Sequence, residues 1–437
     1  MTRAIQPTAI IRRVSAPLDL SIVVPTLNER ENVALLIPAL QRIVASLSIT
    51  AEILVIDGGS TDGTGEQASS QGARVIVVPT GGYGEAIRVG LSEAAGAYVV
   101  TMDADLSHEP RVVADLWAAR GPLTIAIASR YIRGGAAKMS RTRWALSRSL
   151  NIVFARGLSL PAKDLSSGFR IYPASAARAL RARAADFDVL PELLVRAHCG
   201  GWRIVEVPFK YVPRHSGSSK ARVFRLGRAY IRTFGHLWRL RNSIEAADYD
   251  ERAFNSVVPL QRYWQRRRHA IVTRRDARLG RVLDVGCGSS RILRDLGDVV
   301  GVDVAFHKLR YMKRYGPRLV QASVFALPFP DRAFDTVICS EVIEHIESGH
   351  APFHELSRVQ RPGGRLVLGT PDYARRSWRM IEALYRVLAP GGYADEHITQ
   401  YRHDQLRDLV VALGYRHVRT EYVFQSEMIL TFEKQTA

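Results

Sequence analysis

Short apolar runs alternate with helical segments through the first half of the chain, and this alternation limits the possible folds more than any other feature. The runs at residues 21–25, 52–56, 74–78 and 97–101 have the length and composition of buried strands. Amphipathic or glycine-capped helices separate them, and the first is expected to end near residue 47. Strands that alternate with helices form a mostly parallel sheet with helices on its faces. The sequence therefore predicts an α/β fold for this half.

Acidic side chains follow three of these runs. Glu29 comes after the first strand, Asp57 ends the second, and Asp103 and Asp105 follow the fourth. Ligands of such sheets bind beyond the carboxyl ends of the strands, where these side chains converge. Two carboxylates one residue apart hold a divalent cation and, through it, a diphosphate. An isolated Asp-x-Asp is usually an ordinary solvated loop, so the prediction depends on the convergence of all three groups.

The composition indicates a globular protein with anionic partners. A length of 437 residues favours two or three domains. Lysine and arginine number 61 against 42 acidic residues, a net charge of +19, and both halves carry the excess. Nucleotide sugars, phospholipid surfaces and nucleic acid are partners that fit this charge. The three cysteines cannot form a disulfide framework, which suits a reducing cytosol.

The sequence also carries no recognisable membrane-spanning or secretory segment. Arginines interrupt the short apolar run near the N-terminus, so it lacks the core of a signal peptide. No apolar stretch approaches the roughly 18 residues that a bilayer span needs. We expect a cytoplasmic protein that is soluble or peripheral to a membrane.

A second glycine turn opens the other half of the chain. The strand at residues 281–285 ends in a turn with Gly286 and Gly288, and the next strand, residues 299–303, ends at Asp303. Glycines let backbone amides approach a ligand, and an acid at the second strand end suits a ribose diol. The third glycine of a dinucleotide-phosphate motif is absent. We predict two Rossmann-like domains: a flexible N-terminus 1–17, a first domain 18–243, a linker 244–257 and a second domain 258–437.

Five motifs of the first half carry a family resemblance. VPTLNERENV, VIDGGSTDGT, MDADLSHEP, SRYIRGG and DLSSGFRIYP resemble, in this order, the family 2 glycosyltransferases of GT-A fold. The most similar branch contains dolichyl- and polyprenyl-phosphate mannosyl- and glucosyltransferases, and the resemblance covers about residues 18–240. It implies a GDP- or UDP-sugar donor. Gly58 stands where the family often has a second Asp, and Ser107 where related enzymes often have Gln or His.

The resemblance also implies roles for individual residues of the donor site. The nucleotide-sugar site would comprise Pro25, Leu27, Glu29, Ile56, Asp57, Asp103, Ala104 and Arg130. The first five of these would hold the base and the ribose. Asp103 and Asp105 would bind Mg²⁺ or Mn²⁺ and the diphosphate, and Arg130, Arg214 and Lys220 would grip phosphates. A metal with nearby arginine and lysine stabilises the charge of a departing diphosphate.

The acceptor side is less defined by the sequence. A hydroxyl acceptor needs a general base, whereas a lipid phosphate is already a nucleophilic anion. Glu192 is the candidate base or acceptor-site acid, and Asp164 is another acceptor-side candidate. Either carboxylate could instead only pair with an arginine. Arg170 could grip an acceptor phosphate or be that structural partner.

Two basic segments follow the first domain's motifs. Residues 220–241 interleave arginines with apolar side chains, a basic amphipathic helix suited to the inner face of an anionic membrane. The alternative is a helix packed on its own domain with solvated arginines. Residues 258–278 are also basic, but we favour a leading helix with a solvated charged face over RNA binding.

The second half resembles the class I S-adenosylmethionine-dependent methyltransferases over about residues 255–437. The motifs are Asp284-x-Gly-x-Gly, Asp303, 327-LPF, 334-FD, 339-CSEVIEH and 361-RPGG. The resemblance implies that Asp284, Gly286 and Gly288 border the methionine part of the cofactor. Asp303 would take the ribose hydroxyls, Ser323 stands where many members have Asp near adenine, and Glu341 would border the cofactor.

Methyl transfer needs the acceptor atom to be aligned with the methyl–sulfur bond of the cofactor, and sometimes a base for the acceptor hydroxyl. His345 and His397 are the candidate catalytic residues, with a structural role as the alternative for each. Glu341-x-x-Glu344-His345 also resembles a metal motif of some O-methyltransferases, although many relatives share the string without a metal.

Three hypotheses follow from these motifs. The leading one is a bifunctional enzyme that transfers a hexose, with inversion, to polyprenyl phosphate and methylates a lipid, sugar or glycan. The second keeps both activities but makes the sugar acceptor a hydroxyl of a cell-surface polysaccharide, with Glu192 as the base. The third is a basic RNA-associated scaffold with one degenerate domain. Both halves keep their acidic ligand sets, which argues against the third.

Overall fold

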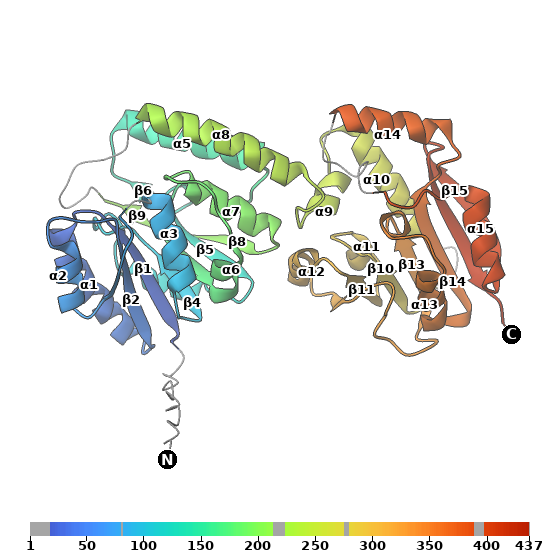
Figure 1. Ribbon diagram of the computed structural model, residues 1–437, viewed down its shortest axis with the longest axis horizontal. Helices are drawn as coiled ribbons and strands as arrows, with labels where there is room; N and C mark the ends of the chain where they lie inside the picture. The colour runs from blue at the N-terminus through green and yellow to red at the C-terminus, as the bar shows by residue number, and fades with distance from the viewer. Residues whose placement is uncertain (1–17, 80–81, 213–222, 275–278, 389–396, 437) are drawn as a thin grey trace, which may run out of the picture. The chain divides into compact units, whose positions relative to one another are not determined.

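The structure is a computed structural model that describes residues 18–79, 82–212, 223–274, 279–388 and 397–436. Side chains are described for these residues except 223–227 and 384–388. The chain divides into two compact units (Figure 1). The first unit comprises two segments, Met1–Leu194 and Ile204–Thr233. The second comprises Val195–Arg203 and Phe234–Ala437.

A seven-stranded mixed sheet forms the centre of the first unit, in the order β3-β2-β1-β4-β7-β5-β8. Its strands are β1 (Leu20–Thr26), β2 (Ala51–Asp57), β3 (Arg74–Val77), β4 (Tyr98–Thr101), β5 (Thr124–Ser129), β7 (Arg170–Pro173) and β8 (Arg203–Pro208). β1 to β4 pair in parallel, whereas β7 runs antiparallel to β4 and β5. A separate pair joins β6 (Ala136–Ala137) and β9 (Lys210–Tyr211). The parallel half therefore has all its carboxyl ends at one edge.

Helices connect and cover these strands (Figure 1). They are α1 (Arg30–Ser46), α2 (Thr64–Ser70), α3 (Gly82–Glu93), α4 (Val112–Ala118), α5 (Arg141–Gly157), α6 (Ala174–Ala179), α7 (Val189–Cys199) and α8 (Val223–Asn242). α3 lies close to the sheet because Gly90 has no side chain: an added Cβ would lie 2.2 Å from Val23 Cγ1. This close approach packs α3 directly on β1 and β2.

The second unit has a seven-stranded sheet of its own, in the order β12-β11-β10-β13-β14-β16-β15. Its strands are β10 (Val282–Val285), β11 (Val299–Asp303), β12 (Arg318–Gln321), β13 (Phe334–Ser340), β14 (Gln360–Pro371), β15 (Tyr415–Val423) and β16 (Glu427–Lys434). The first five run in parallel, and β16 is antiparallel to β14 and β15. The glycine turn after β10 lies at the centre of this sheet's carboxyl edge.

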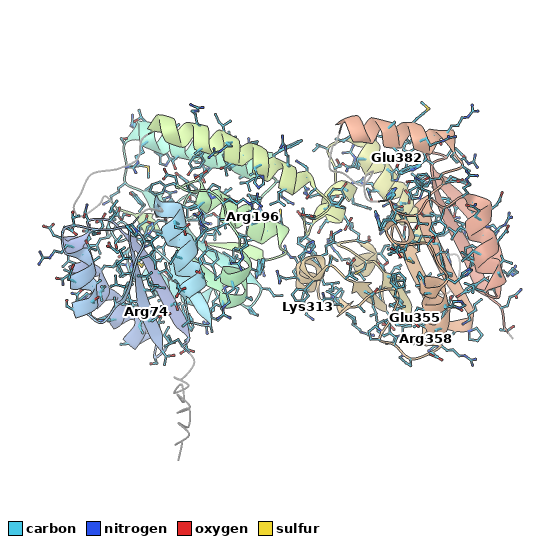
Figure 2. The ribbon with its side chains drawn as sticks, viewed as in Figure 1. Arg74, Arg196, Lys313, Glu355, Arg358 and Glu382 are labelled. Carbon is cyan, nitrogen blue, oxygen red and sulfur yellow. The ribbon has the colours of Figure 1, made fainter. Side chains whose placement is uncertain are left out.

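Helices surround this second sheet as well. They are α9 (Tyr249–Phe254), α10 (Pro259–Val272), α11 (Ile292–Asp295), α12 (Phe306–Met312), α13 (Ala351–Val359), α14 (Arg376–Leu388) and α15 (His403–Ala412), with short 3₁₀ helices η1 (Lys313–Tyr315) and η2 (Ile343–His345). Arg358 of α13 pairs with Glu355 and donates to the carbonyl oxygens of Leu327 and Phe329, at 2.9 and 2.8 Å (Figure 2). The 327-LPF segment is thus held by an arginine of a neighbouring helix.

The architecture confirms the predicted fold class of two Rossmann-like α/β sheets, and the observed strands reproduce the predicted ones to within one or two residues. The predicted linker 244–257 contains the helix α9, which belongs to the second unit, and the unit boundary falls within α8 at Thr233. In the described parts of the chain, no helix combines the length and the apolar character that a bilayer span requires.

Candidate functional site

The carboxyl ends of β1, β2 and β4 bring the predicted acidic residues of the first unit to one edge. Thr26 pairs with Asp57 across β1 and β2, and Val23 pairs with Thr101, so Asp103 and Asp105 begin just beyond the same edge. Asp57 and Asp105 are 4% and 5% exposed, whereas the Asp103 side chain is 32% exposed. We call Asp57, Asp103 and Asp105 the carboxylate edge. Of its members, Asp103 is the most accessible to a ligand.

Asp57 shapes the loop that follows β2. Its Oδ1 accepts hydrogen bonds from Thr26 Oγ1 and Ser60 Oγ, at 3.1 and 2.5 Å, and its Oδ2 accepts from the Ser60 amide at 2.9 Å. The turn after β1 is tied to the same loop, because Asn28 donates through its amide to Ser60 Oγ and accepts from the Thr61 amide. Asp57 therefore holds together the two loops that would surround a base and a ribose.

The remaining predicted base-pocket residues differ in their accessibility. Leu27 is 42% exposed, and Pro25 and Glu29 are half-buried. Glu29 accepts from Asn32 Nδ2 at 2.6 Å at the start of α1. Ile56 is fully buried and faces Gly90 of α3, so only its backbone is available to a ligand. Ala104, 3% exposed, is likewise limited to backbone contact.

Neighbouring side chains orient both members of the Asp-x-Asp pair. Tyr83 Oη donates to Asp103 Oδ1 at 3.1 Å, and the Asp103 amide donates to His108 Nδ1 at 3.0 Å. Asp105 Oδ1 accepts from the amide and the hydroxyl of Ser107, at 3.1 and 2.5 Å. Ser107 thus orients the carboxylate of Asp105, two residues before it, by donating both hydrogen bonds. Two oriented carboxylates offer oxygen ligands of the kind that Mg²⁺ and Mn²⁺ prefer.

Arg130 and Asp164 form a buried ion pair. Arg130 donates from Nε and Nη2 to both oxygens of Asp164, at 2.8 and 2.7 Å, and its amide donates to Asp164 as well. Asp164 is 0% exposed and the Arg130 side chain 11%. Asp164 raises the pKa of Arg130, whereas burial opposes this. Pairing with an arginine is the alternative that the sequence left open for Asp164. The pair engages Nε and Nη2 of Arg130, the residue that was predicted to grip phosphate.

Arg170 is enclosed by backbone. It is 0% exposed and donates to the carbonyl oxygens of Leu165, Ser167 and Leu190, each at 2.7 Å. Its remaining contact is Tyr172 Oη at 3.4 Å. These bonds fasten the segment between Asp164 and β7 to the start of α7. Such a guanidinium has a structural role and is inaccessible to an acceptor phosphate.

Glu192 is also engaged inside the fold. It is 2% exposed, and its Oε2 accepts from the amides of Arg183 and Ala184, at 2.9 and 2.8 Å. These bonds connect α7 to the segment after α6. Arg214 and Lys220, the predicted phosphate clamp, lie outside the described residues.

The glycine turn of the second unit forms the predicted cofactor edge. Gly286 and Gly288 have φ values of 70° and 50°, which disfavour other residues. An added Cβ would lie 2.1 Å from Val342 Cγ2 at Gly286, and 2.5 Å from Asp250 Oδ2 at Gly288. The turn therefore needs glycine both for its conformation and for close approach.

Three carboxylates surround this turn. Asp303 accepts from the amides of Gly288 and Ala305, both at 2.7 Å. Asp284 is 3% exposed, and its Oδ2 has no hydrogen-bond partner in the described part of the chain. Burial, with Asp303 and then Asp250 nearby, raises the pKa of Asp284 to about 8. A buried group of carboxylates with an unsatisfied oxygen is a favourable site for a cation.

Asp250 is a residue that the sequence did not indicate. It lies on α9, within the predicted linker, and its Oδ2 accepts from the amide and hydroxyl of Ser289, at 2.9 and 3.0 Å. Lys308 Nζ lies 3.6 Å from the same oxygen. In the sequence, Asp250 is only one acidic residue of a short polar segment. Nothing in that segment indicates a contact with Ser289 of the glycine turn, 39 residues later.

Glu341 and Ser323 were the other predicted cofactor residues. Glu341 has a φ of 60° and pairs with Arg268 of α10, Nη2 to Oε2 at 3.0 Å. The same guanidinium binds Glu427 of β16, which is 1% exposed. The Ser323 hydroxyl accepts from the Phe325 amide at 3.3 Å and so stabilises its own turn. For residues 258–278 the sequence predicted a helix whose charged side chains face the solvent. Arg268 differs from this prediction, because it pairs with two glutamates inside the fold.

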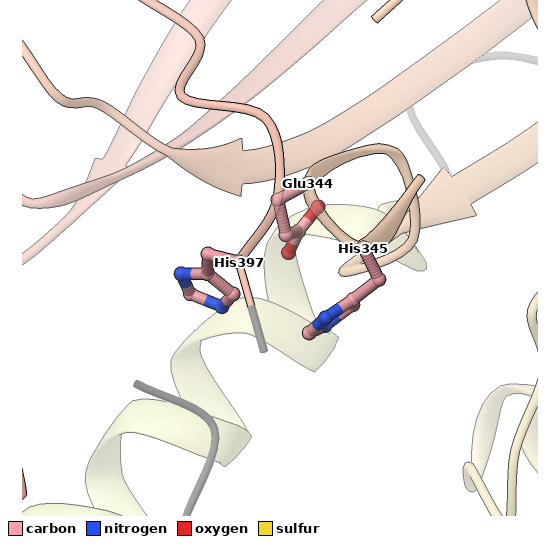
Figure 3. Close-up of side chains that lie close together, drawn as sticks. All are labelled: Glu344, His345 and His397. Atoms are coloured by element: carbon pink, nitrogen blue, oxygen red, sulfur yellow. The ribbon is translucent and has the colours of Figure 1, made fainter. Parts of the chain in front are cut away.

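The two predicted catalytic histidines lie next to each other. The rings of His345 and His397 have centroids 5.0 Å apart, and Glu344 joins them in one group (Figure 3). Burial and then His345 lower the pKa of His397 to about 4, so its ring is neutral near pH 7. Burial raises the pKa of Glu344. The two histidines are 52 positions apart in the chain, and only the fold brings them together.

Comparisons with known proteins match each unit separately. The family described as Glycosyl transferase family 2 matches residues 21–181, and the family described as Methyltransferase domain matches residues 283–368. A dolichol-phosphate mannosyltransferase of Pyrococcus furiosus is 30% identical over 236 residues, 51% of this chain and 64% of that protein. The chain thus spans less than two thirds of this relative's length.

Two further proteins show the extent of the similarity. An uncharacterized glycosyltransferase of Mycobacterium tuberculosis is 32% identical over 216 residues, 46% of this chain and 88% of that protein. A solved S-adenosylmethionine-dependent methyltransferase of Thermotoga maritima, described as a possible histamine N-methyltransferase, is 17% identical with a TM-score of 0.37. That alignment covers 44% of this chain and 97% of the other.

Proposed function

Because the chain belongs to glycosyltransferase family 2 through its first unit and carries a methyltransferase domain in its second, we propose that it is a bifunctional enzyme. The first activity transfers a hexose from a GDP- or UDP-sugar to polyprenyl phosphate. The second transfers a methyl group from S-adenosylmethionine to a lipid, sugar or glycan.

The carboxylate edge supports the donor half of this proposal. Asp103 and Asp105 would hold Mg²⁺ or Mn²⁺, because both are oriented by neighbours and Asp103 remains accessible. The ion supplies positive charge for the departing diphosphate. Asp57 keeps the loops after β1 and β2 closed around the site proposed for the base and ribose.

Polyprenyl phosphate is the proposed acceptor because both acceptor-side carboxylates are already bonded to other groups of the protein. Glu192 accepts two backbone amides, and Asp164 is bonded to Arg130 through both oxygens. Neither is placed to take a proton from a hydroxyl. A phosphate acceptor needs no base: its oxygen forms the bond to the anomeric carbon while the bond to the diphosphate breaks on the opposite face. This favours polyprenyl phosphate over a glycan hydroxyl.

The surface of α5 and α8 supports a lipid acceptor. Phe154 of α5 packs against Tyr230 of α8, with ring centroids 5.7 Å apart, so the two helices contact each other. Apolar and basic side chains lie exposed on them: Trp144, Leu146, Ile152, Val153 and Ile231, with Arg141, Arg143, Arg156, Arg228 and Arg232. Such a surface suits the inner face of an anionic membrane. The name of the Pyrococcus relative, a dolichol-phosphate mannosyltransferase, agrees with this acceptor class.

The glycine turn supports S-adenosylmethionine as the second cofactor. The molecule carries an ammonium and a sulfonium. Asp250, whose pKa is lowered, against the effect of burial, by Lys308 and Ser289, offers negative charge. The unsatisfied Asp284 Oδ2 offers a further oxygen, and a bound cation would favour the ionised form of this carboxyl, whose pKa is otherwise raised to about 8. Asp303 retains acceptor capacity on both oxygens for a ribose diol. When bound, the cofactor supplies an electrophilic methyl group. The protein's residues align it and neutralise its charge.

A membrane assay tests the acceptor. Full-length protein is incubated with polyprenyl phosphate in vesicles, Mn²⁺ and each labelled GDP- or UDP-hexose, and labelled lipid is extracted. We expect an acid-labile labelled lipid with one donor, lost in Asp105→Asn and retained in Glu192→Gln, since a glutamine oxygen can still accept both amides. Loss of transfer in Glu192→Gln with unchanged donor binding would support the hydroxyl acceptor instead. Absence of labelled lipid with every donor would refute the proposal.

A further inference from the structure

Glu344, His345 and His397 form a compact cluster at the carboxyl edge of the second sheet. Glu344 and His345 belong to η2, just after β13, and His397 precedes α15. One ligand atom from each lies within 4.8 Å of those of the other two. Figure 3 shows the carboxylate and the two rings converging from these two segments. We call these three residues the Glu-His-His cluster.

The backbone fixes the two segments to each other. The amides of Ile398 and Thr399 donate to the carbonyl oxygen of Glu344, at 2.8 and 3.0 Å. The Thr399 hydroxyl donates to the carbonyl oxygen of Ile346 at 2.6 Å. His397 is thereby held beside Glu344 by hydrogen bonds from the two residues that follow it to the end of η2, so the fold brings the members of the cluster together.

The Glu344 carboxylate is buried, and its charge needs a compensating partner. It is 0% exposed, and no group among the described residues makes a hydrogen bond of standard geometry to either oxygen. Burial raises the pKa of this carboxyl, because the Thr370 side chain and the backbone of Glu344 itself stabilise the charge only in part. A buried carboxylate is normally paired, hydrogen-bonded or bound to a metal. The atoms that face it from the cluster are imidazole nitrogens. These nitrogens complement the carboxylate as ligands of a common ion.

His397 is oriented as metal-binding histidines are. Its Nδ1 lies 2.8 Å from Tyr373 Oη, and Tyr373 in turn donates to Glu382 Oε1 of α14 at 3.3 Å; Figure 2 labels Glu382. The Trp378 ring stacks on the imidazole at 5.8 Å. With the proton on Nδ1, the lone pair is on Nε2, the nitrogen for which the described residues supply no partner. A second ring nitrogen bonded to a neighbour is the usual support of a histidine ligand.

We propose that Glu344, His345 and His397 bind a divalent transition-metal ion of the Zn²⁺ or Mn²⁺ class, and that this ion binds a hydroxyl of the methyl acceptor. Two imidazoles and one carboxylate suit such ions better than Mg²⁺ or Ca²⁺, which prefer oxygen ligands alone. Ligand atoms around Zn²⁺ lie about 3.3 Å apart, and those of the cluster lie within 4.8 Å of one another, so the side chains would move closer by at most about 1.5 Å. Three protein ligands leave positions open for the acceptor and water.

The acceptor part of the inference rests on the proposed methyltransferase function. A metal ion makes a bound hydroxyl easier to deprotonate, and its proton passes to water. The acceptor oxygen then forms a bond to the methyl carbon, while the carbon–sulfur bond breaks and its electron pair remains on sulfur, giving S-adenosylhomocysteine. Glu341, which is expected to border the cofactor, is three residues from Glu344. The substrate class is therefore a hydroxyl compound and the reaction O-methylation.

Cobalt absorption tests the metal site on the full chain. Apo-protein is titrated with Co²⁺ and then Zn²⁺, and bound metal is counted by equilibrium dialysis. We expect a visible band from a nitrogen-ligated Co²⁺ that Zn²⁺ displaces. His397→Ala and Glu344→Gln should lower the affinity at least about 100-fold, and Tyr373→Phe about 10-fold.

Two controls separate this site from other metal-binding residues. His354→Ala removes an exposed histidine of α13 that lies four residues from His350, and Asp105→Asn alters the proposed donor metal site. Both should keep the cobalt band. A band that survives His397→Ala and Glu344→Gln, or that disappears in His354→Ala, overturns the proposal.

S-adenosylmethionine binding separates this inference from the proposed function. Thermal stabilisation by the cofactor should persist in His397→Ala, which also shows that the variant folds. Loss of the metal site with cofactor binding intact refutes only the inference, whereas failure of the wild type to bind the cofactor refutes the methyltransferase function. Methylation of hydroxyl acceptors should stop on chelation and resume on adding Zn²⁺ or Mn²⁺; chelator-resistant methylation refutes the acceptor role.

Discussion

Arg170→Met should destabilise the first unit because the arginine is a structural connector. The guanidinium is fully buried and donates to three backbone carbonyl oxygens, those of Leu165, Ser167 and Leu190. Methionine has a similar length but no donor, so all three oxygens would lose their bonds in a buried place. The change separates a structural role from the acceptor-phosphate role that the sequence also allowed.

The expected loss follows from the number and kind of these bonds. Each hydrogen bond from a charged donor contributes about 1.5–3 kcal/mol. Three bonds at the lower end give about 4.5 kcal/mol, and relief of the cost of burying the charge reduces this slightly. We expect a loss of about 4 kcal/mol, which lowers Tm by about 10 °C in a unit of this size. Lysine at this position should recover only part of the loss, because it lacks the planar fork.

Thermal unfolding of the full chain measures this loss. The transition of the first unit is identified by its response to a nucleoside diphosphate with Mn²⁺, and that of the second by its response to S-adenosylmethionine. Arg178→Met is the matched control, since Arg178 is exposed on α6 of the same unit, and it should shift Tm by less than about 2 °C. An unshifted Tm in Arg170→Met, together with weaker binding of polyprenyl phosphate, would show that the guanidinium serves the acceptor.

Three further predictions concern the second unit. Arg268→Met should lower its stability by about 3 kcal/mol, because the buried Glu427 of β16 loses its charged partner and keeps the hydrogen bond from Trp264 Nε1. The exposed neighbour change Arg267→Met should cost less than about 0.5 kcal/mol, and denaturant unfolding compares the two. Gly286→Ala should strain the turn by about 1–3 kcal/mol and abolish thermal stabilisation by S-adenosylmethionine, whereas Gly297→Ala, which has open space, should retain it. The contribution of Asp284 to stability should fall as pH rises from 3.8 to about 8, because its pKa is raised in the folded state and the unfolded chain releases that proton first. Asp284→Asn should flatten this slope in denaturant midpoints measured across the range; an unchanged slope would contradict the assignment.

The sequence predicted the two sheets and the placement of the carboxylate edge correctly because these features are local. Strand length, helix periodicity and the residue at each strand end are all visible within a few positions. Parallel connection then brings Asp57, Asp103 and Asp105 to the same edge without further information. The same reasoning placed the glycine turn and Asp303 in the second unit.

The sequence pattern could not predict which side chains far apart in the chain bond to each other. The bonds of Arg130 to Asp164 span 34 positions, and those of Arg170 and Glu192 end on backbone groups that no motif specifies. A motif identifies a residue type at a position, but whether a carboxylate faces a ligand or a buried amide depends on how the segments pack. For this reason the predicted acceptor residues proved to be engaged inside the fold.

By itself, the sequence determined the order of the strands and helices, the acids at the strand ends, the glycines of both turns and the basic surface charge. Tertiary structure alone decided which of these side chains meet. Asp250 reaches the glycine turn from a segment that looked like a linker, and His397 reaches Glu344 across 53 positions. Periodicity is a property of neighbouring residues, whereas a site is a property of distances in space, and only the packing of the sheets and helices sets those distances.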